Sequence, residues 1–279
     1  MIIARSYLYI PAIKEKYYEN IDLNNSDAII FDLEDSVTLK NKSEARNILL
    51  SFLINNKISK KIFIRVNSES EQQAEDIELI NKLADKITGV FLPKVKTSKD
   101  ITIFYKALLE KSYYIIPLIE TPESILNLEN IVKNDYVHTV ALGEVDLSTS
   151  LNIEPKTSYK QMIPIRLFIN IVTAANKKHS PIGPVWLKIN DNKGLTKHMN
   201  TIKDLGYSGA QLIHPNQIGI TNEIFSYTDD EVIWAKQIIK NSKDSLMNTG
   251  SFTDSNNEMV DEAIIKRARK IIETVEKDY

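Results

Sequence analysis

The sequence predicts an α/β fold, a closed (β/α)8 barrel followed by a C-terminal helical tail. Short apolar, β-rich runs alternate strictly with longer segments of helical period along most of the chain. The runs are apolar without alternating polar residues, as expected for parallel strands buried on both faces. A length of 279 residues with 43% hydrophobic residues suits one such barrel. A doubly wound open sheet is the alternative for the same alternation.

Each expected strand is a short apolar run, and each expected helix carries apolar residues at helical spacing. The expected strands are, in order, Ser6–Pro11, Asp27–Asp32, Ile62–Asn67, Gly89–Pro93, Tyr113–Ile119, Val137–Leu142, Pro181–Leu187 and Gly209–His214. The expected helices are Ser43–Asn55, Glu71–Lys86, Ser98–Lys111, Pro122–Asn134, Tyr159–Lys178, Lys193–Leu205 and Asp229–Asn241. One helix start is explicit, because Thr121-Pro122-Glu123 supplies a cap, a proline at the first helical position and an acid for the helix dipole.

The chain is expected to divide into a barrel domain over residues 1–240 and a C-terminal segment over residues 241–279. No Pro/Gly/Ser-rich linker interrupts the first part. Asn241–Asn257 is rich in Ser, Asn, Asp and Thr and is expected to form a loop or hinge. Met259–Val275 regains helical period and is expected to form a helix.

Composition and missing motifs exclude several classes of function. The chain has 35 Lys+Arg against 37 Asp+Glu, a formal charge of −2, and so lacks a basic field for nucleic acid or an anionic membrane. With no Cys, it has no disulfide scaffold, thiolate zinc site or cysteine nucleophile. Its 8 Gly form neither a G-x-G-x-x-G turn nor a phosphate loop, and its 4 His show no H-x-x-x-H spacing. Because it shows neither a signal-like N-terminus nor a long apolar run, a cytoplasmic location is expected.

Polar and charged residues follow most of the expected strands, at the end where barrel enzymes build their active sites. These strand-end segments are Asp32-Leu33-Glu34-Asp35, Arg65-Val66-Asn67, Pro93-Lys94, Glu120-Thr121, Gly143-Glu144-Val145-Asp146 and His214-Pro215. One charged loop residue would mean little, but so many strand ends together predict a pocket rich in carboxylates with one arginine and one lysine.

Two of these acids are candidate ligands for a hard divalent cation. Glu120 and Asp146 follow adjacent strands, so their carboxylates can converge on one ion. Mg²⁺ typically takes one or two protein carboxylates and completes its coordination with substrate and water. The structural alternatives are that Glu120 complements a helix dipole and that Asp146 caps a loop. As a pair at neighbouring strand ends, they are better explained as Mg²⁺ ligands.

Arg65 is the candidate substrate-binding residue, because it lies between Ile64 and Val66 at the end of an apolar strand. A buried charge there is costly without a partner or a function. Its guanidinium can bind the carboxylate of a 2-oxoacid bidentately. The alternative is an internal ion pair with Glu34 or Asp35, and both arrangements can hold at once.

Lys94 and His214 are further candidates for substrate contact. Lys94 can act as a Schiff-base nucleophile, as in metal-independent aldolases. The favoured interpretation is that Lys94 is a charge partner for the acids or for an anionic group of the substrate. His214 can contact the ligand, and a packing histidine bonded to backbone explains it equally well.

An ordered set of motifs resembles the citrate lyase β-subunit-like family of the HpcH/HpaI aldolase and acyl-CoA lyase superfamily. The motifs span nearly the whole chain, and the D-L-E-D-x-V and I-H-P-x-Q patterns are the most specific of them. In this chain they read Arg5-Ser6-Tyr7-Leu8-Tyr9-Ile10-Pro11, Asp32-Leu33-Glu34-Asp35-Ser36-Val37, Ile64-Arg65-Val66-Asn67, Leu92-Pro93-Lys94, Leu118-Ile119-Glu120-Thr121, Gly143 through Asp146, and Ile213-His214-Pro215-Asn216-Gln217.

The resemblance implies a TIM barrel that assembles as a homotrimer or a hexamer of trimers. It implies a lyase that cleaves a 3-hydroxyacyl-CoA thioester such as citryl-, citramalyl- or malyl-CoA into a 2-oxoacid and a shorter acyl-CoA. Glu120 and Asp146 would bind Mg²⁺, Arg65 would bind the 2-oxoacid, and Glu34 and Asp35 would support Arg65 and metal-bound water.

The resemblance also assigns the C-terminal segment to a lid. The matching residues are Gly250-Ser251-Phe252 and Glu258 through Ala263. In lidded members an Asp at the place of Asp261 acts as acid/base in a neighbouring subunit's site. The presence of this segment favours free CoA, rather than an acyl carrier protein, as the carrier of the acyl group.

Two departures from the family pattern affect the expected pocket. Where the family usually reads G-A-E-D, this chain has Gly143-Glu144-Val145-Asp146, and where members carry I-D-x-V it has Ile182-Gly183-Pro184-Val185. These departures keep a non-catalytic or regulatory barrel as an alternative to the lyase. An aldolase on free 2-oxoacids without CoA is a second alternative, because the strand-end acids give no positive evidence for binding of adenine or phosphate.

Overall fold

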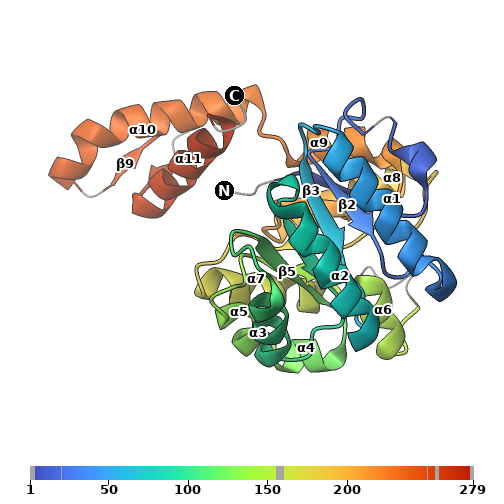
Figure 1. Cartoon of the computed structure of the whole chain (residues 1–279). Coiled ribbons are helices and arrows are strands. Elements are labelled where there is room, and N and C mark those ends of the chain that lie inside the picture. The colour runs from blue at the N-terminus through green and yellow to red at the C-terminus, as the bar shows by residue number, and fades with distance from the viewer. Residues whose placement is uncertain (1–3, 20, 155–159, 250, 255–257, 277–279) are drawn as a thin grey trace. The chain divides into compact units, whose positions relative to one another are not determined.

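The barrel predicted from the sequence is present. The computed structural model describes residues 4–19, 21–154, 160–249, 251–254 and 258–276. Within these residues, eight parallel strands close into a barrel in chain order, with helices around it (Figure 1). Closure of the first strand onto the eighth, in the register Ser6–Ala210, excludes the open doubly wound sheet. The strands are β1 (Ser6–Pro11), β2 (Ala28–Asp32), β3 (Lys61–Arg65), β4 (Gly89–Leu92), β5 (Tyr114–Ile119), β6 (Ala141–Leu142), β7 (Ile182–Gly183) and β8 (Gly209–Leu212).

The apolar strands fill two separate layers of core, because successive side chains point to opposite faces of a strand. Phe63 and Phe91 pack inside the barrel with their ring centroids 5.5 Å apart and their planes at 89°. Tyr7 joins them from β1, 5.7 Å from the Phe63 ring. The neighbouring residues Ile62 and Ile64 belong instead to the core that includes the surrounding helices. An aromatic cluster therefore fills part of the barrel interior.

The helices of the first compact unit differ from the expected ones mainly in length. They are α1 (Lys42–Asn55), α2 (Ser70–Leu83), α3 (Ser98–Ala107), α4 (Pro122–Leu126), α5 (Leu128–Lys133), α6 (Glu144–Ser150), α7 (Ile163–Ala175), α8 (Asn192–Asp204) and α9 (Ile218–Phe225). The expected helix Pro122–Asn134 is divided at Asn127. Helices α6 and α9 were not expected, because each directly follows a strand-end motif and is too short to show a clear period. Tyr159, the expected start of the helix at α7, lies outside the described residues.

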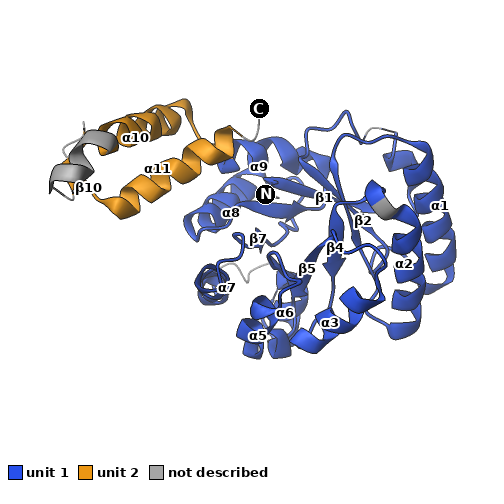
Figure 2. Cartoon of the chain, turned by 60° about the vertical axis from the view of Figure 1, so that its left-hand side comes forward, with its two compact units in different colours: residues 1–225 blue, residues 226–279 orange. Residues whose placement is uncertain are grey.

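The chain forms two compact units, residues 1–225 and 226–279 (Figure 2), so the division comes earlier than the expected boundary at residue 240. Helix α10 (Asp229–Thr249) packs against α11 (Glu262–Val275) through an apolar cluster that includes Ile238 and Ile265. This packing places the start of α10 in the second unit.

The expected loop at Asn241–Asn257 is wrong for its first part. Helix α10 continues through Thr249, because its sequence contains neither Pro nor Gly to end the helix before that point. A short antiparallel pair follows, formed by β9 (Phe252–Thr253) and β10 (Met259–Val260). Gly250, part of the lid motif, lies outside the described residues.

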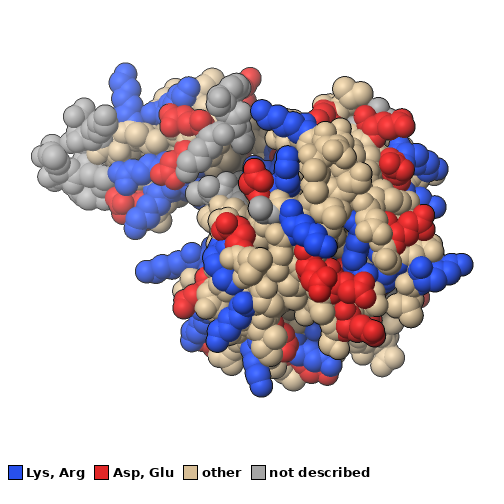
Figure 3. All heavy atoms as spheres, in the orientation of Figure 1, with Lys and Arg blue, Asp and Glu red and all other residues tan. Residues whose placement is uncertain are grey.

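Charged side chains of both signs are interspersed over the visible face of the first unit (Figure 3). This distribution accompanies the formal charge of −2. Among the described helices, none combines the length and the apolar character needed to cross a bilayer.

Candidate active site

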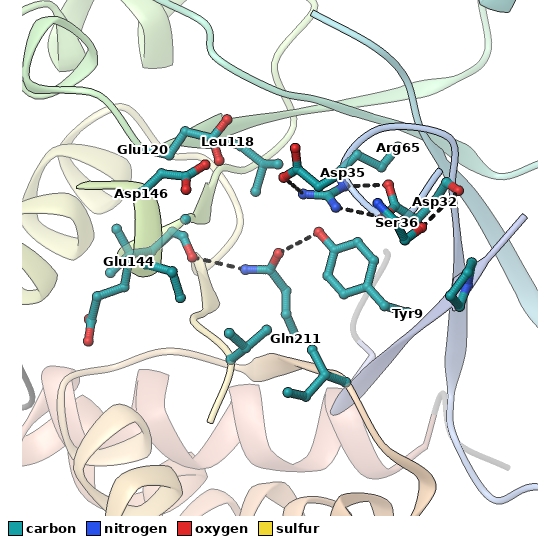
Figure 4. Close-up of a pocket in the computed structure, with 16 residues that line it drawn as sticks. Tyr9, Asp32, Asp35, Ser36, Arg65, Leu118, Glu120, Glu144, Asp146 and Gln211 are labelled. Atoms are coloured by element: carbon teal, nitrogen blue, oxygen red, sulfur yellow. Dashed lines mark hydrogen bonds and ion pairs between the residues drawn. The ribbon is translucent and has the colours of Figure 1, made fainter. Parts of the chain in front are cut away.

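A cavity of about 430 Å³ lies at the carboxyl ends of the barrel strands. Its walls combine acids, one arginine and several apolar side chains (Figure 4). The lining residues used below are Tyr9, Asp32, Asp35, Arg65, Leu118, Glu120, Leu142, Gly143, Glu144, Val145, Asp146, Val185, Gln211 and Ile213. In the close-up, Glu120 and Asp146 lie on one side of the cavity and Arg65 on the other. The structure thus brings together Arg65, Asp35, Glu120 and Asp146 as the sequence predicts.

Arg65 is held by acids from the end of β2. Its Nε and Nη2 each lie 2.7 Å from one oxygen of Asp32, which makes a bidentate pair. Its Nη1 lies 3.1 Å from Glu34 Oε2 and 3.5 Å from Asp35 Oδ2. The Arg65 guanidinium also stacks over Tyr9, 4.9 Å from the ring centroid. The internal ion pairs considered as an alternative for Arg65 are therefore present.

Asp32 is a site residue that the sequence analysis did not single out. The β2–β3 register pairs Asp32 directly with Arg65, so two last-in-strand residues of opposite charge face each other. Asp32 also accepts hydrogen bonds from the backbone N–H groups of Glu34 and Ser36, which shapes the loop after β2. Burial alone would raise the pKa of Asp32, but the charge and hydrogen bonds of Arg65 outweigh burial and lower it. The strand ends themselves were the signal that could have identified this pair.

Glu120 and Asp146 lack such charge compensation. Neither makes an ion pair within the described part of the chain. Glu120 is only 3% exposed, and its Oε1 accepts a 2.6 Å hydrogen bond from the backbone N–H of Lys94. A Cβ atom at Gly143 would lie 2.4 Å from Glu120 Oε2, so a glycine is required beside this carboxylate. The backbone of the β6–α6 connection thus packs directly against Glu120.

Burial and mutual repulsion raise the pKa values of two carboxyl groups at the carboxyl ends of the strands, which form the mouth of the barrel. Burial is the largest cause for Glu120, followed by the charge of Glu34, and the pKa rises to about 8. Burial likewise raises the pKa of Glu34 to about 7, although Arg65 opposes the shift. An acid cluster with raised pKa values favours a bound cation, because the cation offsets the repulsion between carboxylates.

Tyr9 and Gln211 form a polar bridge across the cavity that the sequence analysis missed. The Tyr9 hydroxyl donates to Gln211 Oε1 at 2.9 Å. Gln211 Nε2 in turn donates to the carbonyl oxygens of Leu142 and Gly183, at 3.0 and 3.1 Å. This bridge joins β1 to β6, β7 and β8. Its bond between Tyr9 and Gln211 is drawn in Figure 4.

Lys94 lies beside a second cavity of about 370 Å³, which shares Asp35, Glu120 and Asp146 with the first. Its Nζ is 3.3 Å from Glu34 Oε1, and its backbone adopts a left-handed φ of 50°. Burial would lower the pKa of Lys94, but Glu34, together with Asp35 and Glu120, raises it and the net shift is upward. A Schiff-base lysine must lose its proton. This environment therefore favours the charge-partner interpretation.

His214 and Asp261 have local structural partners. His214 Nδ1 accepts from the backbone N–H of Asn216 at 3.2 Å, and His214 lines neither cavity. This matches the alternative of a histidine bonded to backbone. Asp261, in the second unit, caps α11 by accepting from the N–H groups of Ala263 and Ile264. Its catalytic role stays a prediction.

The two departures from the family pattern have different outcomes. Glu144 turns its carboxylate to Arg166, a buried residue of α7, while Val145 lines the cavity. At Gly183, a Cβ would meet Ile202 of α8 at 2.7 Å, so a side chain there would point toward the helix layer. The loss of the family's Asp at position 183 therefore does not remove a polar group from the cavity.

The residues present fit a hard divalent cation. Glu120 and Asp146 offer two carboxylates without an ion-pair partner, at the side of the cavity where the pKa of Glu120 is raised. One or two protein carboxylates are the usual protein ligands of Mg²⁺, with water and substrate as the others. The described residues contain no cluster of three or more His, Cys, Asp or Glu arranged for a metal.

A closed parallel barrel with charged groups gathered at the carboxyl ends of its strands is the arrangement of a barrel enzyme. The chain belongs to the HpcH/HpaI aldolase/citrate lyase family, whose model matches residues 5–215. It is 27% identical to mitochondrial citramalyl-CoA lyase of Rattus norvegicus over 96% of this chain and 85% of that protein. It is also 27% identical to citrate lyase subunit beta of Escherichia coli strain K12, over 98% of this chain and 93% of the relative.

A solved structure shares the fold. CitE from Mycobacterium tuberculosis, in complex with magnesium, acetoacetate and coenzyme A, matches with a TM-score of 0.80 and 22% identity over 97% of each chain. The family and the relatives named as lyases place the chain among the lyases, as the sequence predicts.

Proposed function

We propose that the protein is a Mg²⁺-dependent carbon–carbon lyase that cleaves a 3-hydroxyacyl-CoA thioester into a 2-oxoacid and a shorter acyl-CoA. The observation that carries this proposal is the cavity where Glu120 and Asp146 face Arg65. Relatives named citramalyl-CoA lyase and citrate lyase subunit beta support the substrate class. The CitE structure with magnesium and coenzyme A supports the metal and the thiol.

Glu120 and Asp146 would hold the ion, which supplies Lewis-acid stabilisation of the oxygen charge that develops during cleavage. Arg65 orients the carboxylate of the substrate, while Asp32 and Glu34 hold the guanidinium in place. Asp35 is the most accessible acid of this group, with 58% of its side chain exposed, and it lines both cavities. We assign Asp35 as the group that takes up the proton of the substrate hydroxyl.

The bonds and protons balance without a further reactant. As the hydroxyl oxygen becomes a carbonyl, the bond between that carbon and the thioester α-carbon breaks, and its electron pair moves into the thioester enolate. A proton returned to the α-carbon then completes the acyl-CoA. We assign that donation to Asp261 of a neighbouring subunit, with the second unit as a lid in a homotrimer. A positioned acid or base contributes about 10²–10⁴-fold in rate.

The cavity wall favours a 2-oxoacid with a small apolar substituent. Its apolar side chains include Leu118, Leu142, Val145, Val185 and Ile213. Among the described residues that line the first cavity, Arg65 is the sole cation, and acids already surround it. Lys94, at the second cavity, is paired with Glu34. A methyl group can pack against this wall, whereas a second carboxylate would lack a free cation. The proposed order of preference is citramalyl-CoA, which yields pyruvate, over citryl-CoA, which yields oxaloacetate.

The test is a product assay with citramalyl-, malyl- and citryl-CoA and with the free hydroxyacids, each with Mg²⁺ or with EDTA. We expect equimolar amounts of 2-oxoacid and shorter acyl-CoA, and no free CoA thiol. These products should form only when Mg²⁺ is present. Release of free CoA with an intact hydroxyacid would show thioester hydrolysis and contradict the proposal. Cleavage of free hydroxyacids would show the CoA-independent aldolase. Absence of turnover with every substrate, together with no Mg²⁺ effect on the melting temperature, would favour the non-catalytic barrel.

A further inference from the structure

We infer that the buried ion pair between Glu144 and Arg166 is a positioning device that sets the place of Asp146 relative to Glu120. The inference rests on the proposed function, because it assigns these carboxylates to one metal ion. Neither Glu144 nor Arg166 was a candidate site residue in the sequence analysis. Their pairing joins residues 22 positions apart, from α6 and α7.

The contacts fix both the position and the rotation of the Glu144 carboxylate. Arg166 Nε donates to Glu144 Oε2 and Nη2 donates to Oε1, each at 2.7 Å. Two parallel bonds between a guanidinium and a carboxylate restrict geometry more than a single contact does. Arg166 is 0% exposed and Glu144 is 7% exposed, so water does not compete for these bonds.

Arg166 is itself anchored in the helix layer. The Tyr207 hydroxyl donates to the Arg166 carbonyl oxygen at 3.0 Å, and Tyr207 is buried. Ile169, one turn further along α7, is also fully buried in the core between the barrel and the helices. The guanidinium is therefore presented from a rigid element, and the first turn of α6 is tied to that element.

Contacts on two sides restrict the position of the segment from Gly143 to Asp146. On one side, Gly143 lies so close to Glu120 that an added Cβ would overlap Oε2. On the other side, Glu144, the first residue of α6, is tied to Arg166. Asp146 follows two residues later in the same helical turn. A shift of this turn toward Glu120 is blocked sterically, and a shift away breaks the ion pair.

Stability alone does not account for this pair. A buried ion pair loses much of its Coulombic gain to desolvation, and apolar residues of similar size often stabilise a fold equally well. An apolar pair would hold α6 against α7, but it would lack the two directional bonds. The ion pair differs from such a replacement in fixing orientation, which a metal ligand nearby requires.

The experiment separates orientation from stability with a paired substitution. In Glu144→Leu/Arg166→Met, both charges are removed together, so neither is left buried alone. We expect a folded protein whose dissociation constant for Mg²⁺, measured by isothermal titration calorimetry, rises by about tenfold or more. The parent protein and the variant are both tested as full chains, with Mg²⁺ alone as the ligand.

A second buried pair supplies the matched control. Arg46 Nε contacts Asp76 Oδ1 at 2.7 Å, and neither residue lines the two cavities at the barrel mouth. In Arg46→Met/Asp76→Asn, the ion pair is lost while an acceptor oxygen remains for the backbone N–H of Asn67. Mg²⁺ affinity is expected to stay within about twofold of the parent, whatever the loss in melting temperature.

Arg166→Lys keeps the inference testable if the double variant does not fold. Lysine retains the charge but not the planar pair of donors, so Mg²⁺ binding is expected to weaken in the same direction. Unchanged Mg²⁺ affinity in the folded double variant, or in Arg166→Lys, would overturn the inference and leave the proposed function standing. A parent protein that binds no Mg²⁺ would overturn both.

Discussion

The two sides of the barrel mouth carry the same kind of side chain under opposite electrostatic conditions. On the β2–β3 side, Asp32 pairs bidentately with Arg65, and its pKa is lowered. On the β5–β6 side, Glu120 and Asp146 make no ion pair within the described residues, and burial with acidic neighbours raises the pKa of Glu120 to about 8. Both sides come from residues at strand ends. Partners, rather than residue type, therefore distinguish a structural carboxylate from one that is available to a ligand.

The largest effect is expected from removing an uncompensated acid. Asp146→Ala should reduce lyase kcat/KM with Mg²⁺ by about 10³-fold or more, because a ligand of the ion that stabilises developing charge is lost. The measurement is 2-oxoacid formation from the preferred thioester. Asp204→Ala, at an exposed position of α8, is the control and should leave the rate unchanged. Full turnover by Asp146→Ala would remove Asp146 from the metal site.

Breaking the compensated side should reduce stability as well as substrate binding, because Arg65 is paired with buried acids and also lines the cavity. Arg65→Met leaves Asp32 and Glu34, with side chains only 3% and 4% exposed, without their cation. Loss of one partner of a buried pair costs about 3–5 kcal/mol, which urea unfolding measures. Arg5→Met should cost less, because the Arg5–Asp27 pair is partly exposed. Equal losses in the two variants would contradict the contrast between the two sides.

The pH dependence of folding stability provides a third test of the difference between the two sides. The pKa of Glu120 is raised in the folded protein, so the folded state binds more protons than the unfolded chain between about pH 5 and 8. Without metal, stability should therefore fall as pH rises through this range, by at most ~1.4 kcal/mol per pH unit for this group.

Glu34, with a pKa raised to about 7, contributes in the same direction. Mg²⁺ should flatten the slope by favouring the ionised carboxylates, and melting curves at several pH values with and without EDTA measure it. A metal-free protein that gains stability between pH 5 and 8 would contradict the raised pKa values.

The smallest effect is expected from one methyl group. Gly143→Ala places a Cβ against Glu120 and should destabilise the protein by about 1–3 kcal/mol, with weaker Mg²⁺ binding. At Gly219, in α9, an added Cβ meets nothing within 4 Å. Gly219→Ala should stabilise the helix by up to about 1 kcal/mol. Thermal unfolding compares the two alanine variants, and a stability gain in Gly143→Ala would show that the approach to Glu120 is not tight.

The sequence predicted the barrel because its strands are apolar on both faces and leave little ambiguity. Ala28-Ile29-Ile30-Phe31 can hardly be anything but a buried strand, whereas β7 has only two residues and no comparable run. Continuation of α10 through Thr249 was missed because the expectation relied on apolar period, whereas a helix can also continue through polar residues when neither Pro nor Gly ends it.

The same contrast applies to the candidate site. Strand ends predicted that Arg65, Glu120 and Asp146 lie near one another, and they line one cavity because the barrel topology gathers strand ends together. The pairing of Glu144 with Arg166, by contrast, depends on how α6 meets α7 in space. No sequence pattern encodes that contact, because its partners lie in separate repeats. The meeting of these residues at one end of the barrel was predictable from topology, whereas a contact between two helices was not.

The aromatic cluster inside the barrel has a kinetic consequence. Tyr7, Phe63 and Phe91 occupy the interior. For the proposed cleavage, substrate then enters and both fragments depart through the same mouth. We expect the fragment held at the carboxylates to leave after the other, so that product release is ordered. The fragment that leaves last binds the free enzyme, and it should therefore inhibit competitively against the thioester.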